Sequence, residues 1–169
     1  NPALADALME YSLMVSAGLA EFVLEEVGEY VDVVVLLDDL GFQDRCYVRP
    51  EVYRERIKPY HRRLVEAIRR KTGAKVLLHS DGSVYSIIPD LIDIGVDALN
   101  PIQVSAAGMD SRRLNEEFGA DLSFWGGIDT HHVLPWGSPE DVRNEVKTRI
   151  RDMGPGGGYV LASVHNIQA

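Results

Sequence analysis

The sequence has one cysteine, no long uncharged apolar run and no excess of basic residues. The lone Cys46 rules out an internal disulfide and fits a protein of the reducing cytoplasm. No apolar run reaches the roughly 18 residues that a membrane helix needs, and no signal peptide is visible. The formal net charge of -9 gives a nucleic-acid partner no basic face to bind. We therefore expect a cytoplasmic protein without a membrane or nucleic-acid partner.

The 169 residues are enough for one domain, which we expect to span residues 1–169. The composition, 46% hydrophobic and 25% charged, is typical of a globular protein. The chain begins at Asn1 rather than at a methionine, so we expect the natural protein to be longer.

Apolar segments of strand type alternate with segments of helical periodicity along the whole chain. The segment 32–37 is a continuous β-branched and apolar run, typical of a strand buried on both faces. Further strands are predicted at 75–78, 98–100, 122–128 and 159–164. Helices are predicted at 4–27, 50–72, 86–94, 111–118 and 139–153, with a kink in the second of them at Pro59.

Five strands joined by helices predict an α/β fold with a parallel sheet and right-handed crossovers. Both a doubly wound sheet and part of a (β/α)8 TIM-type barrel fit this order. No dinucleotide-binding fingerprint follows any strand. Polar residues follow all five strands, as barrel active sites require, so we favour the barrel. A full barrel typically needs about 250 residues, and the chain would supply its last five strands.

The candidate functional residues all follow strands. Carboxyl ends of parallel strands meet at one edge of a sheet, so these side chains are expected around one opening. In chain order the candidates are Asp38 and Asp39, His79 and Asp81, Asn100 and Gln103, Asp129, and His165 with Asn166. His61, His131 and His132 are interpreted as structural or surface residues.

His79, Asp81 and His165 form a set of two nitrogens and one oxygen, as catalytic zinc sites use. Alternate residues of a strand share a face, so His79 and Asp81 are expected to point to one target. A site without metal is the alternative. There His79 and His165 would be proton donors, and the aspartates would hold a cationic or NH-rich substrate.

Taken together, these strand ends resemble those of the uroporphyrinogen decarboxylase superfamily. This group contains haem-pathway decarboxylases and cobalamin-linked methyltransferases, and the resemblance covers nearly the whole chain, aligned to the C-terminal part of the barrel. The segments that carry it are Asp38-Asp39-Leu40-Gly41, His79-Ser80-Asp81-Gly82-Ser83-Val84, Asn100-Pro101-Ile102-Gln103, Trp125-Gly126-Gly127-Ile128-Asp129 and Tyr159-Val160-Leu161-Ala162 with His165-Asn166.

The resemblance implies a zinc ion that holds an acceptor thiol, and a corrinoid carried by a partner protein. Methyltransferase members usually have a cysteine where Asp81 stands and another near His165, so the ligand set here is harder. We expect His79, Asp81 and His165 to bind the metal and to be catalytic. The small-molecule substrate would contact Asp38, Asp39, Asn100, Gln103 and Asp129.

The resemblance favours metal-assisted methyl transfer between a small methylated substrate, or a corrinoid, and an acceptor, and two alternatives to it remain open. The first is a uroporphyrinogen decarboxylase of porphyrin and haem biosynthesis, a lyase. Its acidic substrate would need several basic residues, and only Arg45 and Arg49 are near. The second is a non-catalytic member that binds a ligand. A partial barrel has open sheet edges, so a homodimer is a further expectation.

Overall fold

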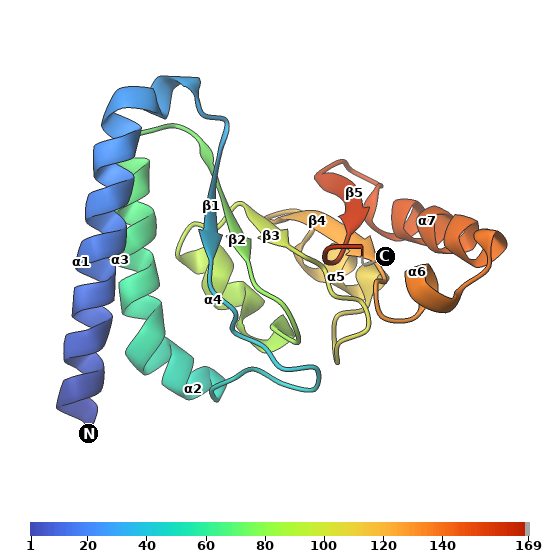
Figure 1. The fold of residues 1–169 in the computed structure, drawn as a ribbon, viewed down its shortest axis with the longest axis horizontal. Helices are drawn as coiled ribbons and strands as arrows, with labels where there is room; N and C mark the ends of the chain where they lie inside the picture. The colour runs from blue at the N-terminus through green and yellow to red at the C-terminus, as the bar shows by residue number, and fades with distance from the viewer. Residues whose placement is uncertain (168–169) are drawn as a thin grey trace.

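The computed structural model describes residues 1–167, and within them the strands form one parallel sheet (Figure 1). The strands follow one another across the sheet in chain order. A barrel has this sequential order, whereas a doubly wound sheet reverses its order at one point. The predicted α/β fold with five parallel strands, of the TIM-barrel type, is confirmed. The strands are β1 (Val33–Leu37), β2 (Lys75–His79), β3 (Ala98–Asn100), β4 (Ser123–Ile128) and β5 (Tyr159–Ser163).

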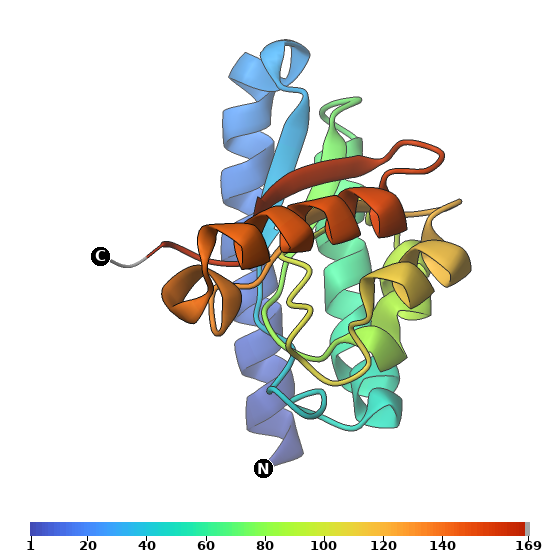
Figure 2. The same cartoon turned by 90° about the vertical axis from the view of Figure 1, so that its right-hand side faces the viewer.

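Helices connect the strands, and the predicted ones are all present. Figure 1 shows α1 and α3 side by side next to β1, with α5 and α7 near β4 and β5. Figure 2, turned by 90°, brings α7 to the front. The short α6 was not predicted. The helices are α1 (Pro2–Val27), α2 (Pro50–Val52), α3 (Lys58–Arg69), α4 (Ile88–Asp93), α5 (Ser111–Phe118), α6 (Val133–Trp136) and α7 (Pro139–Met153).

The helix between β1 and β2 is interrupted next to Pro59, as predicted. A π-helical turn, Tyr53–Ile57, separates α2 from α3. In it the Lys58 amide donates to the Tyr53 carbonyl, five residues back. Proline has no amide hydrogen, so the regular ladder cannot continue through residue 59, and the π turn takes up the change.

Two apolar clusters hold the helices on the sheet. The larger contains Tyr53, Leu99, Phe124 and Met153, which are fully buried or nearly so. The smaller joins α1 and α3 to the sheet through Leu24, Val65, Ile68 and Val76. Burying these side chains is the main source of stability.

The expectation that segment 32–37 is buried on both faces is wrong. Val34 and Leu36 pack on the apolar clusters. Val35 and Leu37 point to the opposite face, where they are 53% and 77% exposed. In a barrel, the face of a strand that points away from the helices lines the interior, which explains why this strand is apolar on both faces. The five described strands do not cover that face, so it is exposed here.

The helix α1 also carries exposed apolar residues, including Leu8 and Phe22. By length and composition alone, the segment Pro2–Tyr30 would suffice to cross a membrane, which the sequence analysis did not expect. Acidic side chains of this helix pair with basic side chains of the π-helical turn Tyr53–Ile57, of α3 and of the two residues that follow α3, as in a helix that packs on a neighbour. The pairs are Asp6–Arg56, Glu10–Arg63, Glu21–Arg70 and Glu25–Lys71.

Candidate metal centre at the carboxyl edge of the sheet

Three side chains meet where β1 and β2 end. Asp39, His79 and Asp81 each offer one ligand atom, and these atoms lie within 4.8 Å of one another. The distance from His79 Nε2 to Asp81 Oδ2 is 3.6 Å, and both side chains are about a quarter exposed. The group is therefore open to a small ligand and holds one nitrogen and two carboxylates.

Strand register explains why Asp39 joins the group. Leu37 pairs with His79 across the two parallel strands, so both point to the same face. Asp39 lies two residues after Leu37, and Asp81 lies two residues after His79, so both aspartate side chains point to that face again. The sequence contained this signal, since the two strand ends align residue for residue, but it predicted Asp39 only as a substrate contact.

The loops that carry the two aspartates are tied together by backbone contacts. Asp39 Oδ1 accepts a hydrogen bond of 3.0 Å from the Asp81 amide, and the Ser80 hydroxyl accepts one of 2.9 Å from the Leu40 amide. Gly82 has a φ of +83°, and a Cβ there would lie 2.4 Å from the Gly41 oxygen. Only a glycine permits this close approach, which explains Gly82 directly after Asp81 and Gly41 two residues after Asp39.

The ring of His79 is also held through its second nitrogen. Its Nδ1 lies 2.6 Å from Asn100 Oδ1 on β3, which pairs with it in the sheet. Asn100 Nδ2 donates to the Trp125 carbonyl on β4, at 3.2 Å. Asn100 was predicted to contact substrate, and the structure shows that it orients the histidine.

Gln103 is 2% exposed and joins three loops. Its Oε1 accepts from the Gly82 amide at 2.8 Å, and its Nε2 donates to Gln43 Oε1 at 2.8 Å. Both ends of the amide are occupied by protein, so these contacts do not support its predicted role in substrate binding.

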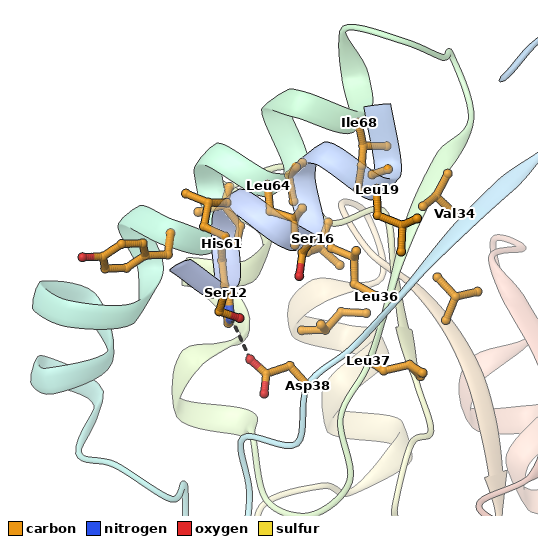
Figure 3. Close-up of a pocket in the computed structure, with 18 of the residues that line it drawn as sticks. Ser12, Ser16, Leu19, Val34, Leu36, Leu37, Asp38, His61, Leu64 and Ile68 are labelled. Atoms are coloured by element: carbon orange, nitrogen blue, oxygen red, sulfur yellow. Dashed lines mark hydrogen bonds and ion pairs between the residues drawn. The ribbon is translucent and has the colours of Figure 1, made fainter. Parts of the chain in front are cut away.

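Asp38 points away from Asp39 and towards α3. Its Oδ2 lies 2.9 Å from His61 Nε2 (Figure 3). On the other side of the ring, His61 Nδ1 lies 3.1 Å from the Tyr53 hydroxyl. Burial, followed by the charges of Asp90 and Asp38, raises the pKa of the Tyr53 phenol, so it stays neutral and donates to His61. His61 is thus partly buried and serves as the partner of Asp38.

Asp38 and His61 also line a cavity of about 770 Å³ between α1, β1 and α3 (Figure 3). Aliphatic side chains such as Leu19, Leu36 and Ile68 form most of its wall. Among the described residues, the lining of the cavity does not include Asp39, His79 or Asp81. The cavity is therefore separate from the candidate metal centre.

Asp129 follows β4 and holds the loop that begins there. Its carboxylate accepts from the amides of His131 and His132, at 2.6 and 3.2 Å, and from His132 Nδ1 at 3.0 Å. Burial alone would raise the pKa of Asp129, but these hydrogen bonds outweigh it and hold the pKa below its usual value. Asp129 is thus an ionised loop anchor near the predicted opening.

His165 lies exposed just after β5. Among residues 1–167, the group of close ligand atoms takes in Asp39 and leaves His165 outside. β5 is three strands from β2, which is about 14 Å along a flat sheet. His165 therefore reaches the same ion only across the barrel interior, and its role as a ligand remains a prediction.

The donor set suits a divalent cation. Imidazole nitrogen and carboxylate oxygen are both zinc ligands, and two ligands at about 2.1 Å from a tetrahedral ion lie about 3.4 Å apart. The 3.6 Å between His79 Nε2 and Asp81 Oδ2 is close to this separation. The residues present thus fit a metal with open positions for another ligand.

Comparison with known proteins gives a family and two kinds of relative. A family model described as uroporphyrinogen decarboxylase (URO-D) matches residues 1–169. The methylated-thiol–coenzyme M methyltransferase of Methanosarcina mazei is 28% identical over 103 residues, which are 61% of this chain and 26% of that protein. A uroporphyrinogen decarboxylase of Pelodictyon phaeoclathratiforme is 22% identical over 154 residues, 91% of this chain and 40% of that one.

A solved structure supports the fold. A methyltransferase from Methanosarcina mazei superposes with a TM-score of 0.67 at 19% identity, covering 89% of this chain and 41% of that one. The chain thus spans about a quarter to two fifths of the length of these relatives. Since the family model matches it from end to end, the chain belongs to the uroporphyrinogen decarboxylase family.

Proposed function

We propose that the chain is part of an enzyme that performs metal-assisted methyl transfer between a small methylated substrate, or a corrinoid, and an acceptor. The observation that carries this proposal is the meeting of Asp39, His79 and Asp81 at the carboxyl edge of the sheet. Barrel enzymes place their active sites at this edge. The relative that bears a methylated-thiol methyltransferase name adds support.

The chain's own residues would hold the ion. His79 would offer a ring nitrogen, and Asp39 and Asp81 one carboxylate oxygen each. The hydrogen bond from the Asp81 amide to Asp39 would keep both carboxylates in place. When bound, the metal would supply the positive charge that keeps an acceptor thiol as its thiolate.

Zinc is the ion we propose, with His165 as a further ligand and catalytic residue. Two carboxylates are harder ligands than two thiolates, so the site should also accept harder divalent ions such as Mn²⁺. The substrate contacts of Asp38, Asn100, Gln103 and Asp129, the corrinoid partner protein, a homodimer and the cytoplasmic location stay predictions.

Uroporphyrinogen decarboxylation is the second candidate, favoured by the relative of that name, which aligns over 91% of the chain. The negative charge at the carboxyl edge of the sheet argues against this reaction. Two carboxylates stand together there, and within residues 1–167 the basic side chain paired with them is that of His79. A substrate rich in carboxylates would be repelled by this pair unless a cation lay between them.

The test is metal content together with activity. Full-length protein is loaded with zinc and measured by mass spectrometry, beside His79→Gln and a matched surface variant, His131→Gln. We expect about one zinc per chain in the parent and in His131→Gln, and none in His79→Gln. Methyl transfer is followed by the absorbance of a methylated corrinoid with a thiol acceptor. Turnover of uroporphyrinogen without bound metal would overturn the proposal in favour of the decarboxylase.

A further inference from the structure

The side chain of Asn100 joins three neighbouring strands. Its Nδ2 lies 3.2 Å from the Trp125 carbonyl, and its Oδ1 lies 2.6 Å from His79 Nδ1. A backbone carbonyl only accepts hydrogen bonds, so the NH₂ group of the amide must face Trp125. The reversed amide would place two oxygens against each other at that distance. The amide oxygen therefore faces His79.

This orientation decides which nitrogen of His79 carries hydrogen. An amide oxygen also only accepts, so the hydrogen bond must be donated by His79 Nδ1. A neutral imidazole has a single N–H, so Nε2 keeps its lone pair. That lone pair lies on the side of Asp81, 3.6 Å from Oδ2.

Two acceptors that face each other at 3.6 Å repel, and a cation between them would relieve this repulsion. An imidazolium that donates from Nε2 to Asp81 is the competing arrangement, but 3.6 Å is too long for such a hydrogen bond. A metal between a ring nitrogen and a carboxylate oxygen needs about this separation. The geometry thus fits a histidine prepared to bind an ion before the ion arrives.

We infer that Asn100 is a positioning residue that fixes His79 in the Nδ1–H tautomer and leaves Nε2 free to bind a metal. The inference rests on the proposed function for the use of that lone pair, whereas the tautomer itself is a property of the metal-free protein. The pairing of His79 with Asn100 in the sheet register keeps the two side chains together. Partners that orient a metal-binding histidine typically strengthen metal binding about 10- to 100-fold.

The tautomer is measured directly by ¹⁵N–¹H correlation spectra of the histidine rings. Full-length metal-free protein is used at a pH where the ring is neutral, and the His79 signals are assigned by their loss in His79→Gln. We expect the Nδ1–H pattern in the parent protein and in Asn100→Asp, whose carboxylate accepts the hydrogen bond from His79 although it loses the donor to the Trp125 carbonyl. Asn100→Ala should shift His79 towards the Nε2–H pattern. Asn144→Ala on the exposed surface of α7 is the matched control and should change nothing.

Zinc titration of the same variants supplies the second readout. Asn100→Ala should bind zinc about 10- to 100-fold more weakly, with Asn100→Asp restoring the affinity. An Nε2–H pattern for His79 in the parent protein would overturn the inference even if neither Asn100 variant folded. An Nδ1–H pattern that persists in Asn100→Ala would overturn it as well. The Nδ1–H pattern in a protein that binds no zinc would leave the inference standing and remove the proposed function instead.

Discussion

Replacing Gly82 with alanine tests how the two loops at the metal group are held together. Gly82 has a φ of +83°, and an added Cβ would meet the Gly41 carbonyl oxygen at 2.4 Å. The left-handed backbone costs an alanine about 1 to 2 kcal/mol. Forcing a methyl group against rigid backbone costs about 1 to 3 kcal/mol more. We therefore expect the free energy of unfolding to fall by about 2 to 5 kcal/mol.

Gly156→Ala is the matched control, because Gly156 has a φ of +87° and nothing within 4 Å of its added Cβ. It should lose only the backbone part, about 1 to 2 kcal/mol. Urea unfolding of full-length protein, followed by circular dichroism, gives both values. Gly82→Ala should also weaken zinc binding, because the loop of Asp81 must move. Equal losses of stability in the two variants would refute the close packing of the two loops.

Two further predictions concern the anchoring of other segments. Asp129 has a pKa below its usual value in the folded protein, so it stabilises the fold above about pH 4, and this contribution is lost as the pH falls further. Asp129→Asn should therefore lower the free energy of unfolding by about 1 to 3 kcal/mol at pH 7, and this loss should shrink as the pH falls below about 4 in urea titrations. A pH-independent loss would contradict this reasoning. Ser138 caps α7 by accepting from the Asp141 amide. Ser138→Ala should cost about 1 kcal/mol in the same titration and Ser138→Asn much less, and equal losses would refute the cap.

The order of elements was predictable because each element is encoded locally. The apolar run 75–78 and the capping sequence at Ser138 predict β2 and α7 without knowledge of their neighbours. The choice of a barrel over a doubly wound sheet needed the strand order, which the structure supplies. The exposed face of β1 was missed, because a run such as 32–37 shows that a strand is apolar but not what covers it.

The candidate site was predictable in part for the same reason. His79 and Asp81 share a strand end, so their common direction follows from the period of two. Asp38 and Asp39 are adjacent and must point apart, but which one faces His79 depends on the register between β1 and β2. The partners of Asn100 and Gln103 come from neighbouring strands and loops, so no sequence pattern indicated that their amides were already occupied.

The measurement that tests the metal centre most directly compares the two adjacent aspartates. Zinc is titrated calorimetrically into metal-free full-length protein, Asp39→Asn and Asp38→Asn. Asparagine at 39 can still accept the hydrogen bond of the Asp81 amide, so the loop should be preserved. We predict that Asp39→Asn lowers zinc affinity by more than about 100-fold, beyond what the loss of an orienting partner costs. Asp38→Asn, whose side chain faces His61, should bind zinc as the parent does. Equal affinities in all three proteins, or no binding to any, would contradict the assignment of Asp39, His79 and Asp81 as the metal centre.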